Sequence, residues 1–213
     1  MNCDTTSTHR LTRLLSLTLW CGVLLFGSAC KKTSDQTRQN ASVSFPVLAT
    51  VPAFSLTSQD NRPFGSEQLR GTPYIAAFMF TRCPSICPRL TATMKKVDVL
   101  LTKEGVSAHL ISISVDPAFD TPPVLAEYAR KHAIDTRHWT FLTGEHSVIA
   151  STAEQGFKVG LSGSLDEKQP HLGITHASHL ILVDAQGAIR GYFRSSDDDV
   201  AEQVLRAMRT ISS

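Results

Sequence analysis

Two cysteines four positions apart, Cys83 and Cys87, are the side chains of this sequence best suited to chemistry. They follow an apolar run at 74–80 that predicts a buried strand. They precede apolar residues at 90, 94, 97 and 101, a spacing that predicts one face of a helix. A helix N-terminus favours thiolate, because its unpaired backbone N–H groups and its dipole stabilise negative charge. A thiolate attacks disulfides and binds soft metal ions, so the pair predicts thiol–disulfide exchange or a metal site.

A third metal ligand would have to come from elsewhere in the chain. His171, His176 and His179 are the candidates, because they lie within or just after a long polar loop at 160–175. Two thiolates and a neutral imidazole form a soft ligand set suited to a copper ion as Cu(I), and residue spacing does not choose among the three histidines. Zinc accepts the same residue types, but structural zinc sites normally use four protein ligands, so copper is favoured. A disulfide between the two cysteines would remove both sulfur ligands, so the redox state of the pair would control metal binding.

Composition restricts the class of protein. The chain has 213 residues, of which 42% are hydrophobic, enough for the core of one domain. Charged residues make up 19% of the chain, a low share that argues against a mainly disordered protein. A net charge of +2 gives no electrostatic case for binding nucleic acid.

The N-terminal 30 residues have the layout of an export signal. Basic residues precede an apolar run at 14–29 that ends in small residues before Cys30. The run is short for crossing a bilayer, and residues 26–30 resemble a bacterial lipoprotein cleavage box. We expect a lipid anchor at Cys30 or an uncleaved N-terminal membrane anchor. Either would place the folded part on the periplasmic face of a bacterial membrane.

Behind this signal, residues 31–48 are polar and predict a flexible linker, and residues 49–213 predict the folded domain. Only Cys83 and Cys87 remain as thiols in that domain. An exported thiol–disulfide oxidoreductase without a metal would use the same dithiol, although thioredoxins space their cysteines as Cys-x2-Cys. A purely structural disulfide would stabilise the fold little, because the loop that it closes is short.

The pattern of apolar residues predicts an α/β fold. The alternation of strand, helix and parallel strand around the cysteines predicts right-handed crossovers, and the whole order is that of a thioredoxin-like mixed sheet flanked by helices, with an N-terminal hairpin and an inserted hairpin and loop. The cysteines then lie beyond the carboxyl ends of the strands, where reactive groups gather in open α/β sheets. The expected hairpins lie at 54–64 and 180–193, the other strands at 74–80, 108–115 and 139–142, and the main helices at 90–105, 122–132, 146–155 and 197–211.

Four motifs in this order resemble the Sco/SenC family over about residues 50–211. They are Phe-x-Phe-Thr-x-Cys-Pro-x-x-Cys-Pro at 78–88, Ser-Val-Asp-Pro-x-x-Asp-Thr-Pro at 114–122, Trp-Thr-Phe-Leu-Thr-Gly at 139–144, and a histidine eleven positions before Gly187.

The resemblance implies a copper chaperone whose two cysteines and one histidine bind copper, with His176 as the matching histidine. Family members deliver copper to the binuclear copper centre of cytochrome c oxidase, and some are better described as thiol–disulfide reductases acting on that centre. The implied partners are the copper-bearing oxidase subunit, a thiol reductant and a copper donor.

Several residues near the cysteines carry further expectations. Asp116 and Asp120 follow a strand, and we expect them to be solvated, with orientation of a ligand or partner as the alternative. Arg82 is expected to offset the negative charge of a copper–dithiolate site. Ser85 stands where family members often have aspartate, which affects the surroundings of the site. Phe119 stands where a charged residue is common, which is expected to alter a partner surface.

Overall fold

Three parallel strands form the middle of the sheet in the computed structural model, which describes residues 44–160 and 178–212. They are β4 (Tyr74–Met79), β5 (His109–Ser114) and β6 (Trp139–Thr143). Every residue of β4 and β6 is buried. This explains why these segments read as continuous apolar runs without alternation, since parallel strands are covered on both faces.

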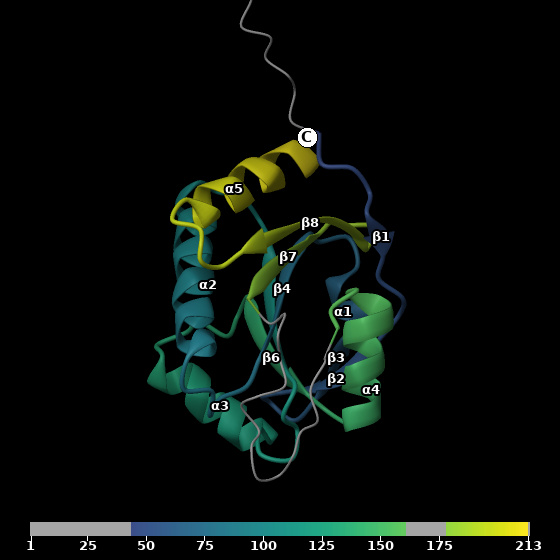
Figure 1. Cartoon of the computed structure of the whole chain (residues 1–213), viewed down its shortest axis with the longest axis vertical. Coiled ribbons are helices and arrows are strands. Elements are labelled where there is room, and N and C mark those ends of the chain that lie inside the picture. Colours follow the sequence, from purple (N-terminus) through teal and green to yellow (C-terminus); the bar gives the residue numbers. More distant parts are fainter. Residues whose placement is uncertain (1–43, 161–177, 213) are drawn as a thin grey trace, which may run out of the picture. The chain divides into compact units, whose positions relative to one another are not determined.

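Antiparallel strands extend the sheet on both sides, giving the order β1-β8-β7-β4-β5-β6-β2-β3. The two hairpins predicted from the sequence are confirmed, and β1 is an additional short strand that the sequence reasoning missed (Figure 1). The added strands are β1 (Ala49–Thr50), β2 (Ser55–Ser58), β3 (Pro63–Gly65), β7 (His179–Val183) and β8 (Ala188–Arg194).

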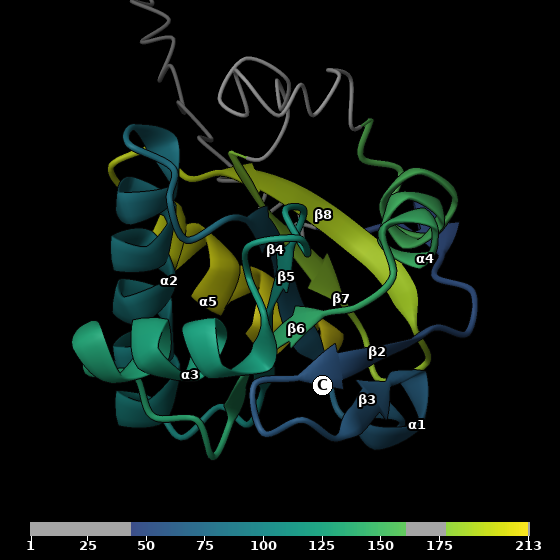
Figure 2. The same ribbon diagram turned by 90° about the horizontal axis from the view of Figure 1, so that it is seen from below.

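Helices cover both faces of the sheet, which confirms the thioredoxin-like architecture. Helices α2, α3 and α5 lie on one side, and α4 lies on the other (Figures 1 and 2). The helix expected at 146–155 is α4 followed by a π-helical segment, η1. The bounds are α1 (Ser66–Leu69), α2 (Ile86–Lys103), α3 (Pro122–Lys131), α4 (His146–Ser151), η1 (Thr152–Gly156) and α5 (Val200–Ile211).

Aromatic rings fill the core on the α4 side. The Phe157 side chain is fully buried, and its ring meets those of Phe54, Tyr74 and Phe78 at centroid distances of 5.8, 6.4 and 5.5 Å. Tyr74 and Phe78 are four residues apart on β4 and therefore project from the same face of the sheet. Phe157 thus joins the segment after η1 to the central strand.

On the same face, His109 is a half-buried structural histidine. Its ring stacks on Phe64 at 5.4 Å, and its Nε2 lies 2.9 Å from the Thr140 hydroxyl. Burial, with a smaller contribution from the charge of His138, lowers the pKa of His109 to about 4. The ring is therefore neutral in the folded protein at neutral pH.

The turn between β7 and β8 is organised by one buried carboxylate. Asp184 accepts hydrogen bonds from the backbone N–H groups of Gln186 (3.0 Å) and Ala188 (2.8 Å) and from Arg190 Nε (2.6 Å). Arg190 Nη1 also donates to the carbonyl of Phe45 at 2.7 Å. The hairpin therefore holds the segment that leads into β1.

This segment packs on the domain, although it falls within the predicted linker. We predicted a linker through residue 48, but the Phe45 ring packs on Phe193 at 6.4 Å and the Leu48 N–H donates to the Ile189 carbonyl at 2.9 Å. The mostly polar composition of 31–48 gave no sign that Phe45 and Leu48 contact the β7–β8 hairpin. The rest of the predicted linker and the signal segment at 1–30 lie outside the described residues. Within 44–160 and 178–212, no helix has the length and apolar character needed to cross a membrane.

Candidate metal and redox centre

Cys83 and Cys87 lie where β4 gives way to α2, as the sequence predicted. Cys83 is in the turn, where its N–H donates to the Phe80 carbonyl at 3.3 Å, and Cys87 is in the first turn of the helix. Both are free thiols, with exposed fractions of 7% and 1%. Pro88 is tolerated next to Cys87, because an N–H in the first helical turn has no intrahelical partner.

The two thiols differ in acidity. Burial acts to raise the pKa of Cys83, but hydrogen bonds from the backbone N–H groups of Ser85, Cys87 and Ile86 and from the Cys87 thiol outweigh it and lower the pKa. Burial is the main cause that raises the pKa of Cys87 to about 12; a hydrogen bond with the Phe80 backbone opposes this rise, and the neighbouring Cys83 and the charge of Asp120 add to it. Cys83 is therefore the sulfur that ionises first, and Cys87 keeps its proton at neutral pH.

A buried carboxylate holds the turn that carries Cys83. Asp120 is fully buried, and its Oδ2 accepts hydrogen bonds from the Thr81 N–H (3.0 Å) and the Ser114 hydroxyl (2.5 Å). Its Oδ1 accepts a hydrogen bond from the Thr81 hydroxyl. Burial raises the pKa of Asp120, while these hydrogen bonds act to lower it. The expectation that Asp120 is solvated is wrong, because the loop after β5 folds back onto the end of β4.

Asp116 is also buried, with a side chain 6% exposed, and it pairs with Arg82 Nε at 2.6 Å. The Arg82 guanidinium carbon lies 4.8 Å from the centroid of the Phe119 ring, which is 45% exposed. The charge of Arg82 is thus matched by the charge of Asp116. This differs from the expectation that Arg82 would offset negative charge on the sulfurs. Phe119 places an apolar group on the surface beside the thiol turn.

Thr81, Ser114 and Tyr128 are neighbours of the thiols that the sequence reasoning did not single out. The Tyr128 hydroxyl lies 2.8 Å from the Thr91 hydroxyl, and so joins α3 to the helix that carries Cys87. Thr81 and Ser114 stand inside the two motifs quoted above, which is the only signal in the sequence that could have marked them.

The three candidate histidines are only partly described. His171 and His176 lie outside the described residues. His179 is the first residue of β7 and borders a cavity of about 300 Å³ together with Lys158 and Tyr192. Among the described residues, no three histidine, cysteine or acidic side chains gather as a metal-binding set.

The register of the sheet nevertheless places the start of β7 at the thiol end. Strand β7 pairs antiparallel with β4, and Ile181 stands opposite Ala76. The chain therefore enters β7 beside the last residues of β4, at the edge from which the thiol turn departs. The described part of this edge carries two thiols that could bind a soft metal ion.

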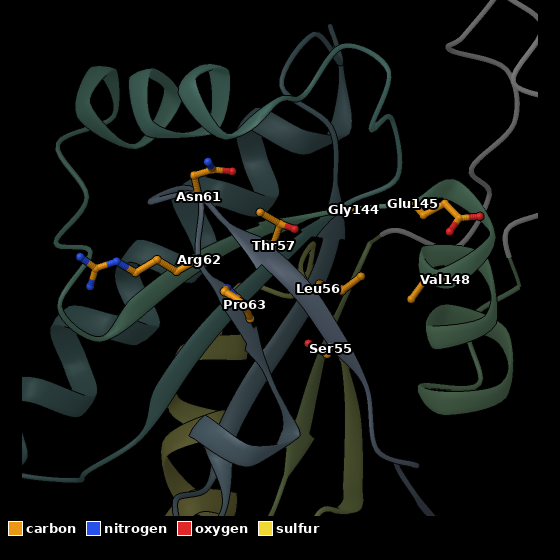
Figure 3. Close-up of a pocket in the computed structure, with 9 residues that line it drawn as sticks. All are labelled: Ser55, Leu56, Thr57, Asn61, Arg62, Pro63, Gly144, Glu145 and Val148. Carbon is orange, nitrogen blue, oxygen red and sulfur yellow. The ribbon is translucent and has the colours of Figure 1, made fainter.

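A separate cavity of about 430 Å³ lies between the β2–β3 hairpin and the start of α4 (Figure 3). Arg62 and Glu145 stand at opposite ends of it, with Leu56 between them. Its nine lining residues include neither cysteine nor histidine, so it is unsuited to a soft metal ion.

Comparison with known proteins adds to this geometry. The SCO1/SenC family model matches residues 46–212. The SCO1 protein homolog of Bacillus subtilis is 29% identical over 169 residues, which are 79% of this chain and 86% of that protein.

Solved structures are similar as well. BsSco, a member of the Sco family of cytochrome c oxidase assembly proteins in which a disulfide switch has been identified, has a TM-score of 0.69 and 27% identity, covering 80% of this chain and 95% of that one. Bradyrhizobium japonicum ScoI, solved with copper bound, has a TM-score of 0.63 and 24% identity, covering 76% of this chain and 99% of that one, a likeness in fold.

Proposed function

The chain belongs to the SCO1/SenC family, and from this premise we propose that it is a membrane-tethered, extracytoplasmic copper chaperone that binds copper through Cys83, Cys87 and His176. Its cargo is destined for the binuclear copper centre of cytochrome c oxidase. The observation that carries the proposal is the pair of buried, unbridged thiols at the N-terminus of α2.

The ligand chemistry supports copper. Two sulfurs one helical turn apart can bind a single ion from one side, and an imidazole completes a trigonal set that suits Cu(I). His176 precedes His179, the first residue of β7, by only three residues. Chain connectivity therefore limits the distance between the Cα atoms of His176 and His179 to about 11 Å. His179 begins β7 at the edge of the sheet where the thiol turn lies.

Redox chemistry at the same thiols would control the cargo. Oxidation of the pair forms one S–S bond and passes two electrons and two protons to an oxidant, which removes both sulfur ligands. A thiol reductant is therefore needed to keep the protein competent in an oxidising compartment. A copper donor and the copper-bearing oxidase subunit complete the set of partners.

The N-terminal segment supports the location. The layout of residues 1–30 is that of an export signal, with Cys30 as the site of lipid attachment or the preceding apolar run as an uncleaved anchor. We place the folded domain at the periplasmic face of a bacterial membrane, where its acceptor would also be exposed.

Copper competition against a chromogenic Cu(I) chelator tests the ligand set. The reduced full chain receives one equivalent of Cu(I), and wild type is compared with Cys83→Ser and His176→Ala. Both variants are expected to lose tight binding. His171→Ala and His179→Ala are the matched controls and are expected to hold copper as wild type does. Wild-type affinity in His176→Ala, or loss only in His171→Ala or His179→Ala, contradicts the proposal.

The difference in acidity between the two thiols favours a second candidate, an exported thiol–disulfide oxidoreductase. In that role Cys83 attacks a partner disulfide and Cys87 resolves the mixed disulfide. Such an enzyme would reduce a test disulfide at the same rate in His176→Ala and would hold no tight copper. A purely structural disulfide would show neither property, and its reduction would lower the thermal stability.

A further inference from the structure

We propose that Asp120 is a positioning residue for the thiol pair. Asp120 fixes the turn bearing Cys83 and thereby makes the Cys83–Cys87 disulfide easier to form. The inference deepens the proposed function, since it takes Cys83 and Cys87 as the working thiols.

The contacts of Asp120 converge on one residue of the thiol turn. Its carboxylate takes both the N–H and the hydroxyl of Thr81, two positions before Cys83, and its remaining hydrogen bond comes from Ser114 at the end of β5. Thr81 and Asp120 are 39 residues apart in the chain, so this is a tertiary contact and not part of a local turn. The side chain of the next residue, Arg82, forms an ion pair with Asp116.

The hydrogen bonds of Asp120 to Thr81 form a clamp on the thiol turn. The sheet does not need this clamp to set its own register. Strands β4 and β5 already pair at six positions, from Tyr74 with His109 to Met79 with Ser114, and the Val115 N–H continues the ladder to the Met79 carbonyl at 3.0 Å. Apart from the hydrogen bond that it accepts from the Ser114 hydroxyl, Asp120 acts beyond the point where that ladder ends. A fully buried carboxylate is costly unless it is well hydrogen-bonded, and here its hydrogen bonds order the backbone that leads to Cys83.

This order bears directly on disulfide formation. The two sulfurs must approach to about 2.05 Å, with a restricted dihedral angle, when each loses its proton and the two electrons leave to an oxidant such as a partner disulfide. If the turn is loose, the dithiol samples more conformations, and ring closure loses more entropy. Releasing Thr81 should therefore make the disulfide less favourable.

The test is the midpoint potential of the disulfide in the copper-free full chain. The protein is equilibrated in glutathione buffers, the free thiols are alkylated, and the peptide with both Cys83 and Cys87 is quantified by mass spectrometry. Asp120→Asn and Thr81→Val are expected to shift the potential to less negative values, by roughly tenfold in the equilibrium constant or about 30 mV for a two-electron couple. Thr81→Ser keeps both donors and is expected to match wild type.

Asp184→Asn is the matched control. Asp184 is likewise buried and accepts two backbone N–H groups, but it lies in the β7–β8 turn, at the opposite end of the sheet from the thiols. It should lower stability without moving the potential. An equal shift in Asp184→Asn, an unchanged potential in Asp120→Asn, or a shift in Thr81→Ser overturns the inference.

Two further points keep the test decisive. If Asp120→Asn does not fold, Thr81→Val decides alone, and an unchanged potential in that variant refutes the role of the clamp. Because no copper is present, a failure here and a failure of copper binding are separate results.

Discussion

The sharpest consequence of the structure is that the two sulfurs should react with an alkylating reagent at very different rates. At pH 8, a thiol with a pKa of about 12, such as Cys87, has about 0.01% thiolate. Cys83 has a pKa below the ordinary 9.0, and so has at least about 10%. The more basic thiolate is intrinsically the better nucleophile, by roughly 20-fold between a pKa of 9.0 and one of 12, which still leaves Cys83 faster by on the order of tenfold or more.

The assay is brief exposure of the reduced full chain to limiting iodoacetamide, followed by tandem mass spectrometry of the peptide that contains both cysteines. Labelling in a high concentration of urea is the control, and there the two rates should become similar, because burial and the helix N–H groups are lost. The exposed fractions of 7% for Cys83 and 1% for Cys87 act in the same direction as the acidity. Equal rates in the folded protein, or faster labelling of Cys87, would refute the reasoning.

Three further predictions concern the fold. Between about pH 6.5 and pH 4 the unfolded chain binds a proton at His109 that the folded chain does not, so the free energy of unfolding should fall through this interval. The fall is about 1–2 kcal/mol, discounted because the ring is partly exposed, and urea denaturation at pH 7 and pH 4.5 should show it in wild type and not in His109→Gln. Phe157→Ala should lower the free energy of unfolding by about 3–5 kcal/mol in urea denaturation, since a fully buried ring is removed from three aromatic contacts. Tyr128→Phe should lower the free energy of unfolding by about 1 kcal/mol, because the hydrogen bond to the Thr91 hydroxyl is lost. Adding Thr91→Val to this variant should cause little further loss, and a larger added loss contradicts the Tyr128–Thr91 hydrogen bond.

Most of the fold was predictable because its signals are local. Continuous apolar runs marked the central strands, turn residues marked the two hairpins, and an apolar face at helical spacing marked α2. Strand β1 was missed because two residues are too few to show the alternation of apolar and polar side chains that marks a strand. The anchoring of Phe45 was missed because its partners, Phe193 and Arg190, lie more than 140 residues away.

For the site, the sequence predicted that two cysteines lie at a strand-to-helix junction, and the structure confirms this placement. The interpretation of Asp116 and Asp120 was wrong. A carboxylate in a loop has no periodic pattern that reveals burial, and the partners that make burial possible, Arg82 and Thr81, come from a different part of the chain. The role of His176 stays a prediction.

The sequence alone determined that two thiols stand at the N-terminus of a helix, because backbone geometry and residue spacing fix that placement locally. Only the tertiary structure decided that the thiols are unequal and that a carboxylate from the neighbouring loop holds the turn between them and β4. Burial and hydrogen-bond partners are properties of a residue's surroundings, and in a folded chain those surroundings are supplied by residues far away in sequence.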